Sequence, residues 1–218
     1  MIEEILPPAV AAVDTREELL DVELFAEEQA ALGQAVEKRR REFITARACA
    51  RRALERLGVA PCAIANGERG QPLWPQGVVG SITHCAGYRA CAVARETQVV
   101  GVGIDAEPHA PLPEGVLGEI ARAEERPRLA RLAGAEPAVH WDRLLFCAKE
   151  AVYKVWFPLA ACWLGFEDAT LTIDPVGRAF RARLLKPWPS PAAALPEILE
   201  GRWLVREGLV LAAIALPR

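Results

Sequence analysis

VVGSITHCAGYRACAVARETQVVGVGIDAEP, residues 78–108, is the stretch that decides the fold class. Three apolar segments within it, Val78–His84, Arg89–Arg95 and Val99–Glu107, each predict a β-strand. Cys85–Gly87 predicts a tight turn, so we expect the first two strands to form an antiparallel hairpin. Prolines follow the third strand and end it.

A long helical region precedes these strands. Thr15 and Glu18 have the spacing of a capping box, which predicts that a helix begins there. Apolar residues recur at helical spacing as far as Leu57, so we expect a mostly helical stretch, broken near Gly33. Residues 61–77 are rich in proline and glycine and predict a loop.

The second half of the chain repeats this order. Residues 114–133 and His140–Trp156 predict helices, and Pro158 is expected to end the second one. Strands are then predicted at Phe166–Ile173, Ala179–Leu185 and Arg202–Leu216, with a proline-rich loop at 187–196. Each half therefore holds a helix followed by about three strands, which indicates a coarse internal duplication and the α+β class.

The composition is that of a globular protein. The 218 residues are 52% hydrophobic and 25% charged, which excludes a disordered or collagen-like chain. A net charge of −3 argues against a general attraction to nucleic acid or to anionic lipid.

Targeting signals and the patterns of a structural zinc site are missing from the sequence. The first four residues are acidic rather than basic, and the apolar runs Phe157–Phe166 and Leu209–Pro217 are about half the length of a membrane span. Six cysteines without a C-x-x-C pair and three histidines argue against a structural zinc site. We expect a reduced, cytoplasmic protein that binds neither nucleic acid nor a membrane.

Two carboxylates lie at the end of the third predicted strand. Asp105 and Glu107 are two residues apart, so their side chains share one face of the strand. The pair is either solvated on an edge strand or a hard-oxygen site for Mg²⁺. Gly101 and Gly103 fit a loose dinucleotide fingerprint, but we reject it because prolines follow where that motif needs a helix.

The helix at His140–Trp156 carries a second set of charges. Glu150 and Lys154 are four residues apart and share a helix face, while Lys149 lies about 100° around the axis. The pair is either a surface salt bridge or a third metal carboxylate, with two lysines beside a phosphorylated ligand. The helical spacing alone is compatible with both.

Two further segments have a structural and a functional interpretation. His84 ends the segment Gly80–His84 and is either a satisfied structural residue or part of a site. The basic run Lys38–Arg41 is either a solvated helix face or a phosphate grip. Arg39 and Arg47 are two turns apart on one face, and two guanidinium groups so placed can bind a polyphosphate at two points.

Together these segments resemble the 4′-phosphopantetheinyl transferase superfamily, and more closely its long, two-lobed class, which serves siderophore, peptide and polyketide synthases. The resemblance runs from about residue 20 to 175. It is carried by K-R-R-R-E-F-x-x-x-R at 38–47, G-x-P-x-W-P at 70–75, G-S-I-T-H at 80–84, G-I-D-x-E at 103–107 and F-x-x-K-E-x-x-Y-K at 146–154.

The resemblance implies a pseudo-dimer of two α+β lobes, residues 1–104 and 105–218, with coenzyme A in the cleft between them. It implies a monomeric enzyme that transfers 4′-phosphopantetheine from coenzyme A to a serine of an apo carrier protein and releases 3′,5′-ADP with the help of Mg²⁺. Another Mg²⁺-dependent phosphoryl-transfer enzyme, such as a diphosphate hydrolase, and a non-catalytic carrier-binding module stay open as alternatives.

The same resemblance assigns roles to individual residues. The expected Mg²⁺ ligands are Asp105, Glu107 and Glu150. The expected catalytic residues are Glu150, as the base for the carrier serine, and Lys154. The residues expected to contact coenzyme A are Arg39, Arg47, Arg69, Ser81, Thr83, His84, Asp105, Lys149 and Lys154. The segment Leu112–Leu132 is expected to meet the acidic carrier protein.

Overall fold

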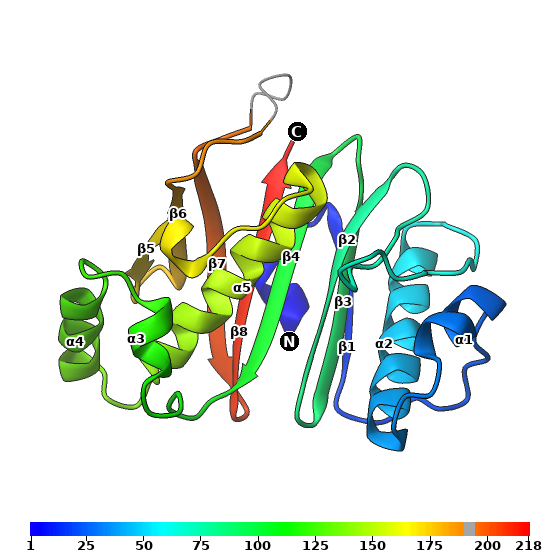
Figure 1. The fold of residues 1–218 in the computed structure, drawn as a ribbon, viewed down its shortest axis with the longest axis horizontal. Helices are drawn as coiled ribbons and strands as arrows, with labels where there is room; N and C mark the ends of the chain where they lie inside the picture. The colour runs from blue at the N-terminus through cyan, green and yellow to red at the C-terminus, as the bar shows by residue number, and fades with distance from the viewer. Residues whose placement is uncertain (190–194) are drawn as a thin grey trace.

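The computed structural model describes residues 1–189 and 195–218 as two lobes that lie side by side (Figure 1). The first lobe contains a short 3-10 helix η1 (Ile2–Ile5), β1 (Val10–Thr15), α1 (Ala26–Leu32), α2 (Glu37–Arg56), β2 (Val78–Cys85) and β3 (Tyr88–Arg95). The second contains β4 (Val99–Pro108), α3 (Val116–Ile120), α4 (Arg126–Ala135), α5 (Trp141–Ala160), a 3-10 helix η2 (Phe166–Asp168), β5 (Ala169–Asp174), β6 (Ala179–Leu184), β7 (Ile198–Arg206) and β8 (Leu209–Pro217).

Each lobe has one antiparallel sheet, so the predicted α+β class is confirmed. The first sheet has the order β1-β3-β2 and the second the order β4-β8-β7-β6-β5. In both, the first strand of the lobe pairs with the last: Val10 lies opposite Ala94, and Pro108 opposite Leu209. The duplicated unit is therefore a strand, then helices, then strands that return to the first one.

The opening strand of the first lobe was not predicted, and the helix start predicted at Thr15 is wrong. Thr15 ends β1, and its hydroxyl accepts a hydrogen bond from the backbone N–H of Glu17 at 3.0 Å. The predicted break near Gly33 is confirmed, because Gly33 has a φ of +51° and separates α1 from α2.

The third predicted strand belongs to the second lobe rather than to the first sheet. β4 pairs along its length with β8, with one irregularity between Val99 and Gly101. The boundary expected between residues 104 and 105 thus falls inside a single strand. The two sheets separate at the turn between β3 and β4, and we place the lobe boundary there, at residues 96–98.

Three smaller differences concern the second lobe. α5 continues through Pro158 to Ala160, because a proline in the last turn removes only one helical hydrogen bond. The helix predicted over residues 114–133 is two short helices, α3 and α4. The last predicted strand is a hairpin, β7–β8, whose turn contains Gly208 at a φ of +75°. The loop predicted at 187–196 lies partly outside the described residues.

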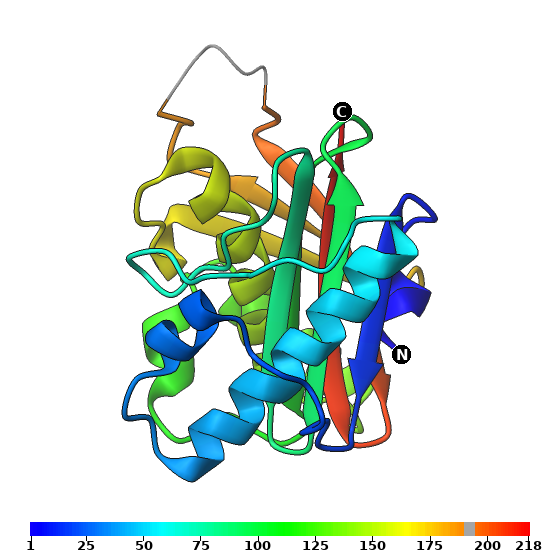
Figure 2. The ribbon, with the colours of Figure 1, turned by 90° about the vertical axis from the view of Figure 1, so that its right-hand side faces the viewer.

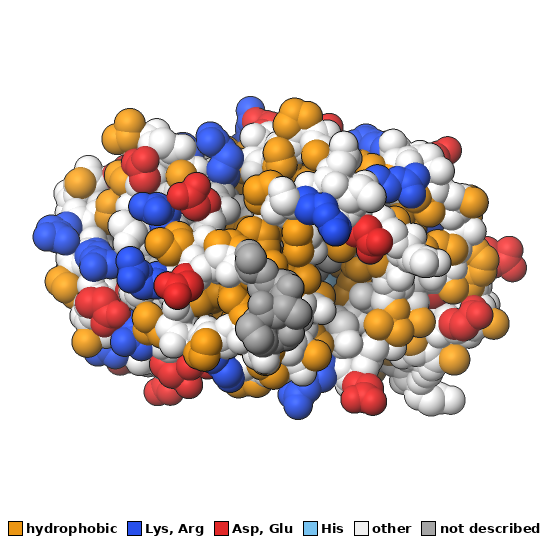
Figure 3. Space-filling view, turned by 90° about the horizontal axis from the view of Figure 1, so that it is seen from above, with side chains coloured by type: hydrophobic (Ala, Val, Ile, Leu, Met, Phe, Trp, Pro, Cys, Tyr) orange, Lys and Arg blue, Asp and Glu red, His pale blue; other side chains and the backbone are white. Residues whose placement is uncertain are grey.

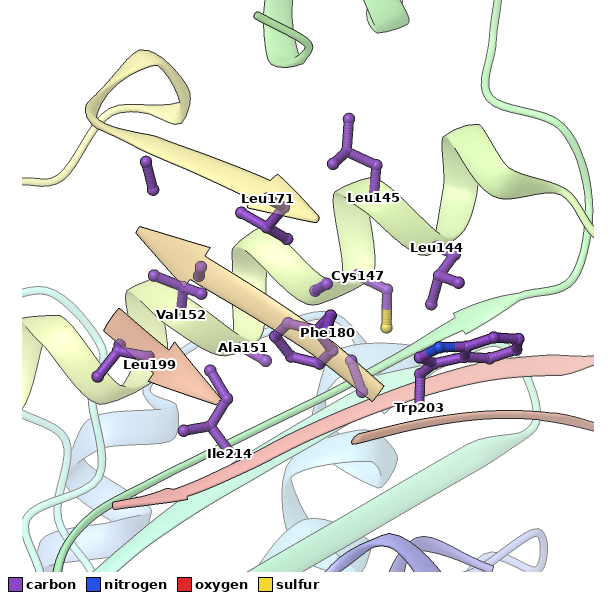
Figure 4. Packing of buried hydrophobic residues seen from close by; sticks show 14 of the residues in the cluster. Leu144, Leu145, Cys147, Ala151, Val152, Leu171, Phe180, Leu199, Trp203 and Ile214 are labelled. Atoms are coloured by element: carbon purple, nitrogen blue, oxygen red, sulfur yellow. The ribbon is translucent and has the colours of Figure 1, made fainter. Parts of the chain in front are cut away.

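The lobes are layered so that the sheets lie inside and the long helices outside (Figures 1 and 2). α2 covers the three-stranded sheet and α5 covers the five-stranded one, while the inner faces of both sheets form a third core. Leu144 and Ala151 of α5 pack with Phe180, Trp203 and Ile214 of the sheet (Figure 4). Among the described residues, no helix combines the length and the apolar character that a membrane span requires.

Two glycines allow α5 to approach β4 closely. A Cβ atom added to Gly103 would lie 2.1 Å from the backbone oxygen of Ala151, which is closer than atoms can pack. One added to Gly101 would lie 3.2 Å from Leu159. The glycines of the rejected dinucleotide fingerprint therefore serve packing. Because side chains alternate along a strand, Asp105 also faces α5.

Two hydroxyl groups join the lobes where β2 runs beside β4. The Ser81 hydroxyl accepts a hydrogen bond from Ile104 N–H at 3.1 Å. The Thr83 hydroxyl accepts one from Ala106 N–H at 3.1 Å and donates to Asp105 Oδ1 at 3.1 Å. No backbone ladder pairs these strands in the described part of the chain. The two buried side chains take its place, and we refer to them as the hydroxyl joint.

The hydroxyl joint leads to a prediction about stability. Thr83→Val keeps the shape of the side chain but leaves Ala106 N–H and Asp105 short of a partner in a buried site. We expect the free energy of unfolding to fall by about 1–3 kcal/mol in urea denaturation. Thr97→Val, at an exposed turn, is the matched control. Equal stability of the two variants would show that the joint contributes nothing.

Candidate active site

A cavity of about 210 Å³ lies between the lobes, at the end of the hydroxyl joint. The first lobe lines it with Arg69 and its neighbours from the loop at 61–77 and with Ser81 from β2. The second lobe lines it with Glu150, Tyr153 and Lys154 from α5. Residues from three of the predicted motifs therefore meet at one place, although they are far apart in the sequence.

A smaller, more apolar cavity of about 100 Å³ adjoins the first and shares Glu150 and Tyr153 with it. Trp163 and Phe166 contribute to its walls, and the rings of Tyr153 and Trp163 are 5.2 Å apart. Seen from above, hydrophobic side chains gather over the middle of the molecule, where the surface is hollowed (Figure 3). The site thus has a charged compartment and an apolar one.

Asp105 is the most buried carboxylate of the site, with an exposed fraction of 5%. Its Oδ1 accepts hydrogen bonds from Lys154 Nζ at 2.7 Å and from Thr83 at 3.1 Å. Lys154 Nζ also donates to the backbone oxygen of Ile104 at 3.0 Å. Oδ2 of Asp105 is buried and has no hydrogen-bond partner, which is rare for a carboxylate oxygen and suits a position that receives a ligand.

Glu107 is held by a residue that sequence reasoning missed. Arg143 donates to Glu107 Oε2 at 2.9 Å and also to the backbone oxygens of Ala110 and Pro111, at 3.1 and 3.0 Å. It therefore fixes the chain that follows β4 onto α5. The helical spacing could have indicated Arg143 as a site residue, because it lies two turns before Glu150 and so on the same helix face.

Glu150 has neither an ion pair nor a side-chain hydrogen bond with any other residue that the structure describes. Burial and, next, the negative charge of Asp105 raise its pKa above the usual value. Burial and Asp105 also raise the pKa of Glu107, against the opposing effect of Arg143. The three carboxylates are therefore near enough to repel one another, as a shared site requires.

In this structure the carboxylates Asp105, Glu107 and Glu150 are not arranged as the ligands of one metal ion. Within residues 1–189 and 195–218, the structure contains no group of three histidine, cysteine, aspartate or glutamate side chains that could hold a metal ion. Glu107 is engaged by Arg143 and Asp105 by Lys154. The unpartnered oxygen of Asp105 and the unpaired Glu150 are the features that fit a cation.

Lys149 lines the smaller cavity but spends its ammonium group on contacts within the protein. Its ammonium group is buried and forms an ion pair with Glu125 at 2.9 Å. It also donates to the backbone oxygens of Ile120, Phe166 and Ala169, at 2.8, 2.8 and 3.1 Å. All its donors are used within the protein, so Lys149 ties α5 to the segments around it.

The basic residues of the first lobe differ in burial, with Arg39 at the surface and Arg47 inside the protein. Arg39 and His84 meet at the surface, with Arg39 Nη1 2.9 Å from His84 Nε2. Desolvation and, next, the charge of Arg39 lower the pKa of His84. Arg47, expected beside Arg39, is buried and donates to Asn66 Oδ1 at 2.6 Å. Burial lowers its pKa to about 10.

Ser81 and Thr83 lie at the site, but their hydroxyl groups belong to the joint between the lobes. The structure therefore brings together Arg69, Glu150, Lys154 and Asp105, with Glu107 close by and the pair Arg39–His84 on the first lobe. Arg47, Lys149 and Thr83 make contacts within the protein. Ser81 and Lys149 also line the two cavities.

The repulsion among the carboxylates leads to a second prediction. Glu150→Gln removes one negative charge, so we expect the free energy of unfolding at pH 7.5, without metal, to rise by roughly 0.5–2 kcal/mol. A raised pKa in the folded state means that Glu150 binds its proton more tightly there than in the unfolded chain. Wild-type protein therefore gains stability as the pH falls through that pKa.

The advantage of Glu150→Gln should accordingly shrink between pH 7.5 and pH 4, because pH 4 lies below the raised pKa and the wild-type carboxylate is then largely neutral. Urea denaturation at both pH values measures it. Glu55→Gln, which removes an exposed carboxylate from α2, is the control for a general effect of charge. A constant difference across this pH range would contradict the raised pKa of Glu150.

Comparisons with known proteins identify the family. Residues 27–94 match the model of the 4′-phosphopantetheinyl transferase N-terminal domain, and residues 101–207 match that of the 4′-phosphopantetheinyl transferase superfamily. The chain is 49% identical over 223 residues to 4′-phosphopantetheinyl transferase Npt of Nocardia iowensis, covering 99% of each chain. It is 52% identical over 195 residues to 4′-phosphopantetheinyl transferase PptT of Mycobacterium tuberculosis, covering 87% of this chain and 85% of that one.

A more distant relative is enterobactin synthase component D of Salmonella typhimurium. It is 30% identical over 185 residues, which cover 84% of this chain and 75% of the relative. The matches to the two family models are separated at residues 95–100, around the β3–β4 turn, so each falls within one lobe. The chain belongs to the 4′-phosphopantetheinyl transferase superfamily, in its long class, and is an enzyme of that transferase type.

Proposed function

We propose that this transferase takes the 4′-phosphopantetheine group from coenzyme A and attaches it to a serine of an apo carrier protein. The observation that carries the proposal is the cavity between the lobes. One wall offers the cation of Arg69, and the opposite wall offers Glu150 and Lys154, with Asp105 bound to Lys154. Opposite charges across one cleft suit a diphosphate that is bound together with a cation.

Coenzyme A has three parts that match three parts of the site. Its 3′-phosphate suits the pair Arg39–His84, where a guanidinium group and a ring nitrogen lie 2.9 Å apart. Its diphosphate suits the charged cavity with Arg69 and Lys154. Its pantetheine arm is largely apolar and suits the adjoining cavity beside Tyr153 and Trp163.

Mg²⁺ would be held by Asp105, Glu107 and Glu150, whose hard oxygen atoms are the ligands this ion prefers. The free Oδ2 of Asp105 and the unpaired Glu150 support the assignment. Glu107 would join after leaving Arg143. When bound, the ion supplies positive charge that neutralises the diphosphate and lowers the pKa values of the carboxylates that repel one another.

The residues of the chain account for the transfer step. Glu150, directly or through a water molecule, takes the proton from the carrier serine, whose oxygen forms a bond to the phosphorus that bears pantetheine. The bond from that phosphorus to the bridging oxygen breaks, and the bridging oxygen leaves with 3′,5′-ADP. Lys154, fixed by Asp105 and Ile104, stabilises the charge that develops on the phosphates.

The carrier protein would dock beside the second lobe. The segment Leu112–Leu132 includes α3 and the first part of α4, and it packs its apolar side chains against α5. Arg131, next to this segment's end, is exposed and offers a positive charge to an acidic partner.

Asp105→Asn tests the cation site. The amide keeps the size of the side chain but weakens both the ion pair with Lys154 and the affinity for Mg²⁺, so we expect transfer to fall by at least about 100-fold. Mass spectrometry of an apo carrier protein incubated with coenzyme A and Mg²⁺ measures the modification. Asp21→Asn, at an exposed loop position, is the control.

Full modification of the carrier by Asp105→Asn would show that transfer does not need the Asp105 carboxylate. Phosphopantetheine released from coenzyme A by the wild-type protein without a carrier would instead indicate a diphosphate hydrolase. Carrier binding without any modification would indicate a non-catalytic module.

Arg39→Ala tests the placement of the 3′-phosphate. We expect the KM for coenzyme A to rise about tenfold, while the KM for dephospho-coenzyme A, which lacks this phosphate, stays unchanged. Arg40→Ala, at the next exposed position of α2, should change neither value. An equal rise of KM for both substrates would place Arg39 elsewhere on the ligand.

A further inference from the structure

A hydrogen-bonded hairpin places Arg69 at the cleft. Residues 65–73 fold back on themselves, with the N–H of Gly67 donating to the oxygen of Gln71 at 2.7 Å and that of Leu73 donating to Ala65 at 2.8 Å. The side chain of Gln71 accepts a hydrogen bond from Arg69 N–H at 3.0 Å. Hydrogen bonds therefore hold the tip of this hairpin to its own base.

The base of the hairpin is fixed from below by buried groups. Ile64 N–H donates to Glu28 Oε1 at 3.0 Å, in the segment that leads into the hairpin. Asn66 Oδ1 accepts from Arg47 at 2.6 Å. On the outgoing side, Trp74 Nε1 donates to the oxygen of Gly80 in β2 at 3.0 Å.

Glu28 is the centre of these contacts. Its side chain is fully buried in α1, and its carboxylate accepts from Phe25 N–H at 3.0 Å and from Arg51 in an ion pair. Arg47 Nε lies 3.8 Å from the same carboxylate. A buried carboxylate is retained only where several donors compensate its desolvation, and here these donors come from α1, α2 and the hairpin segment.

Arg47 receives its orientation from two sides. Glu28 attracts the guanidinium group, and the ring of Phe43 lies 4.2 Å from it. The group can then donate to Asn66, the first residue of the bridge that closes the hairpin. The charge of Glu28 thus acts on the hairpin twice, directly at Ile64 and through Arg47 at Asn66.

We propose that Glu28 is a positioning residue for the coenzyme A site, although it does not line the cleft. Its carboxylate sets the place of the hairpin at residues 65–73, and the hairpin sets the place of Arg69 opposite Lys154. This inference rests on the proposed use of the cleft for coenzyme A. It gives the buried ion cluster of Glu28, Arg47 and Arg51 a role in ligand binding in addition to its role in stabilising the fold.

The test compares Glu28→Gln with Glu37→Gln, which removes an exposed carboxylate paired with Arg41 on α2. We expect Glu28→Gln to raise the KM for coenzyme A and its calorimetric Kd about tenfold, because the hydrogen bonds to a charged acceptor weaken. The kcat at saturating coenzyme A should stay within about twofold of the wild type. Glu37→Gln should leave KM, Kd and kcat unchanged.

A double variant separates positioning from folding. If Glu28 acts through Arg69, then Arg69→Ala alone raises KM, and adding Glu28→Gln to it raises KM no further. The proposal would be overturned if the rises of KM caused by the two substitutions multiply in the double variant. A lower Tm of Glu28→Gln with unchanged KM and Kd would also overturn it. If Glu28→Gln does not fold, Asn66→Ala breaks the contact between Arg47 and the hairpin and should give the same rise of KM.

The failure of this inference differs from the failure of the proposed function. If wild-type protein neither binds coenzyme A in calorimetry nor modifies a carrier, the proposed function is wrong. If the wild type does both and Glu28→Gln binds coenzyme A with unchanged Kd, only the role of Glu28 is wrong.

Discussion

Two side-chain hydroxyls hold the lobes of this enzyme together at the point where its chemistry is placed. Ser81 and Thr83 occupy alternate positions of β2 and accept the backbone N–H groups of Ile104 and Ala106 in β4. A backbone ladder would have merged the two sheets into one. Hydroxyl groups instead join the strands while the two sheets stay separate, and the cavity between the lobes lies beside them.

The joint also fixes the electrostatics of the cleft. Thr83 donates to Asp105, and Asp105 in turn binds Lys154, so one hydrogen-bonded chain runs from the first lobe to α5. Gly103 lets that helix approach β4, which brings Glu150 to the same carboxylate. The resulting repulsion is a cost of folding, and the proposed cation would relieve it.

The first lobe contributes by orientation as much as by contact. Arg39 reaches the surface beside His84, whereas Arg47, two turns further on α2, is buried with Glu28 and Asn66. A basic helix face thus divides into one residue that can meet a ligand and one that holds the neighbouring loop. In the second lobe, Arg143 fixes Glu107 of β4 and Glu125 fixes Lys149 of α5.

Local patterns in the sequence predicted the strands at 78–108, the helix around Glu150, the α+β class and the motifs that indicate the family. These features are local, because alternation, helical spacing and turn residues act over a few positions. No local pattern predicted that β4 belongs to the second sheet, that β1 is part of the first, or that Lys149 and Arg47 point inward. Those points depend on the folded chain, since the partner of a strand edge or of a buried charge comes from residues far away in the sequence.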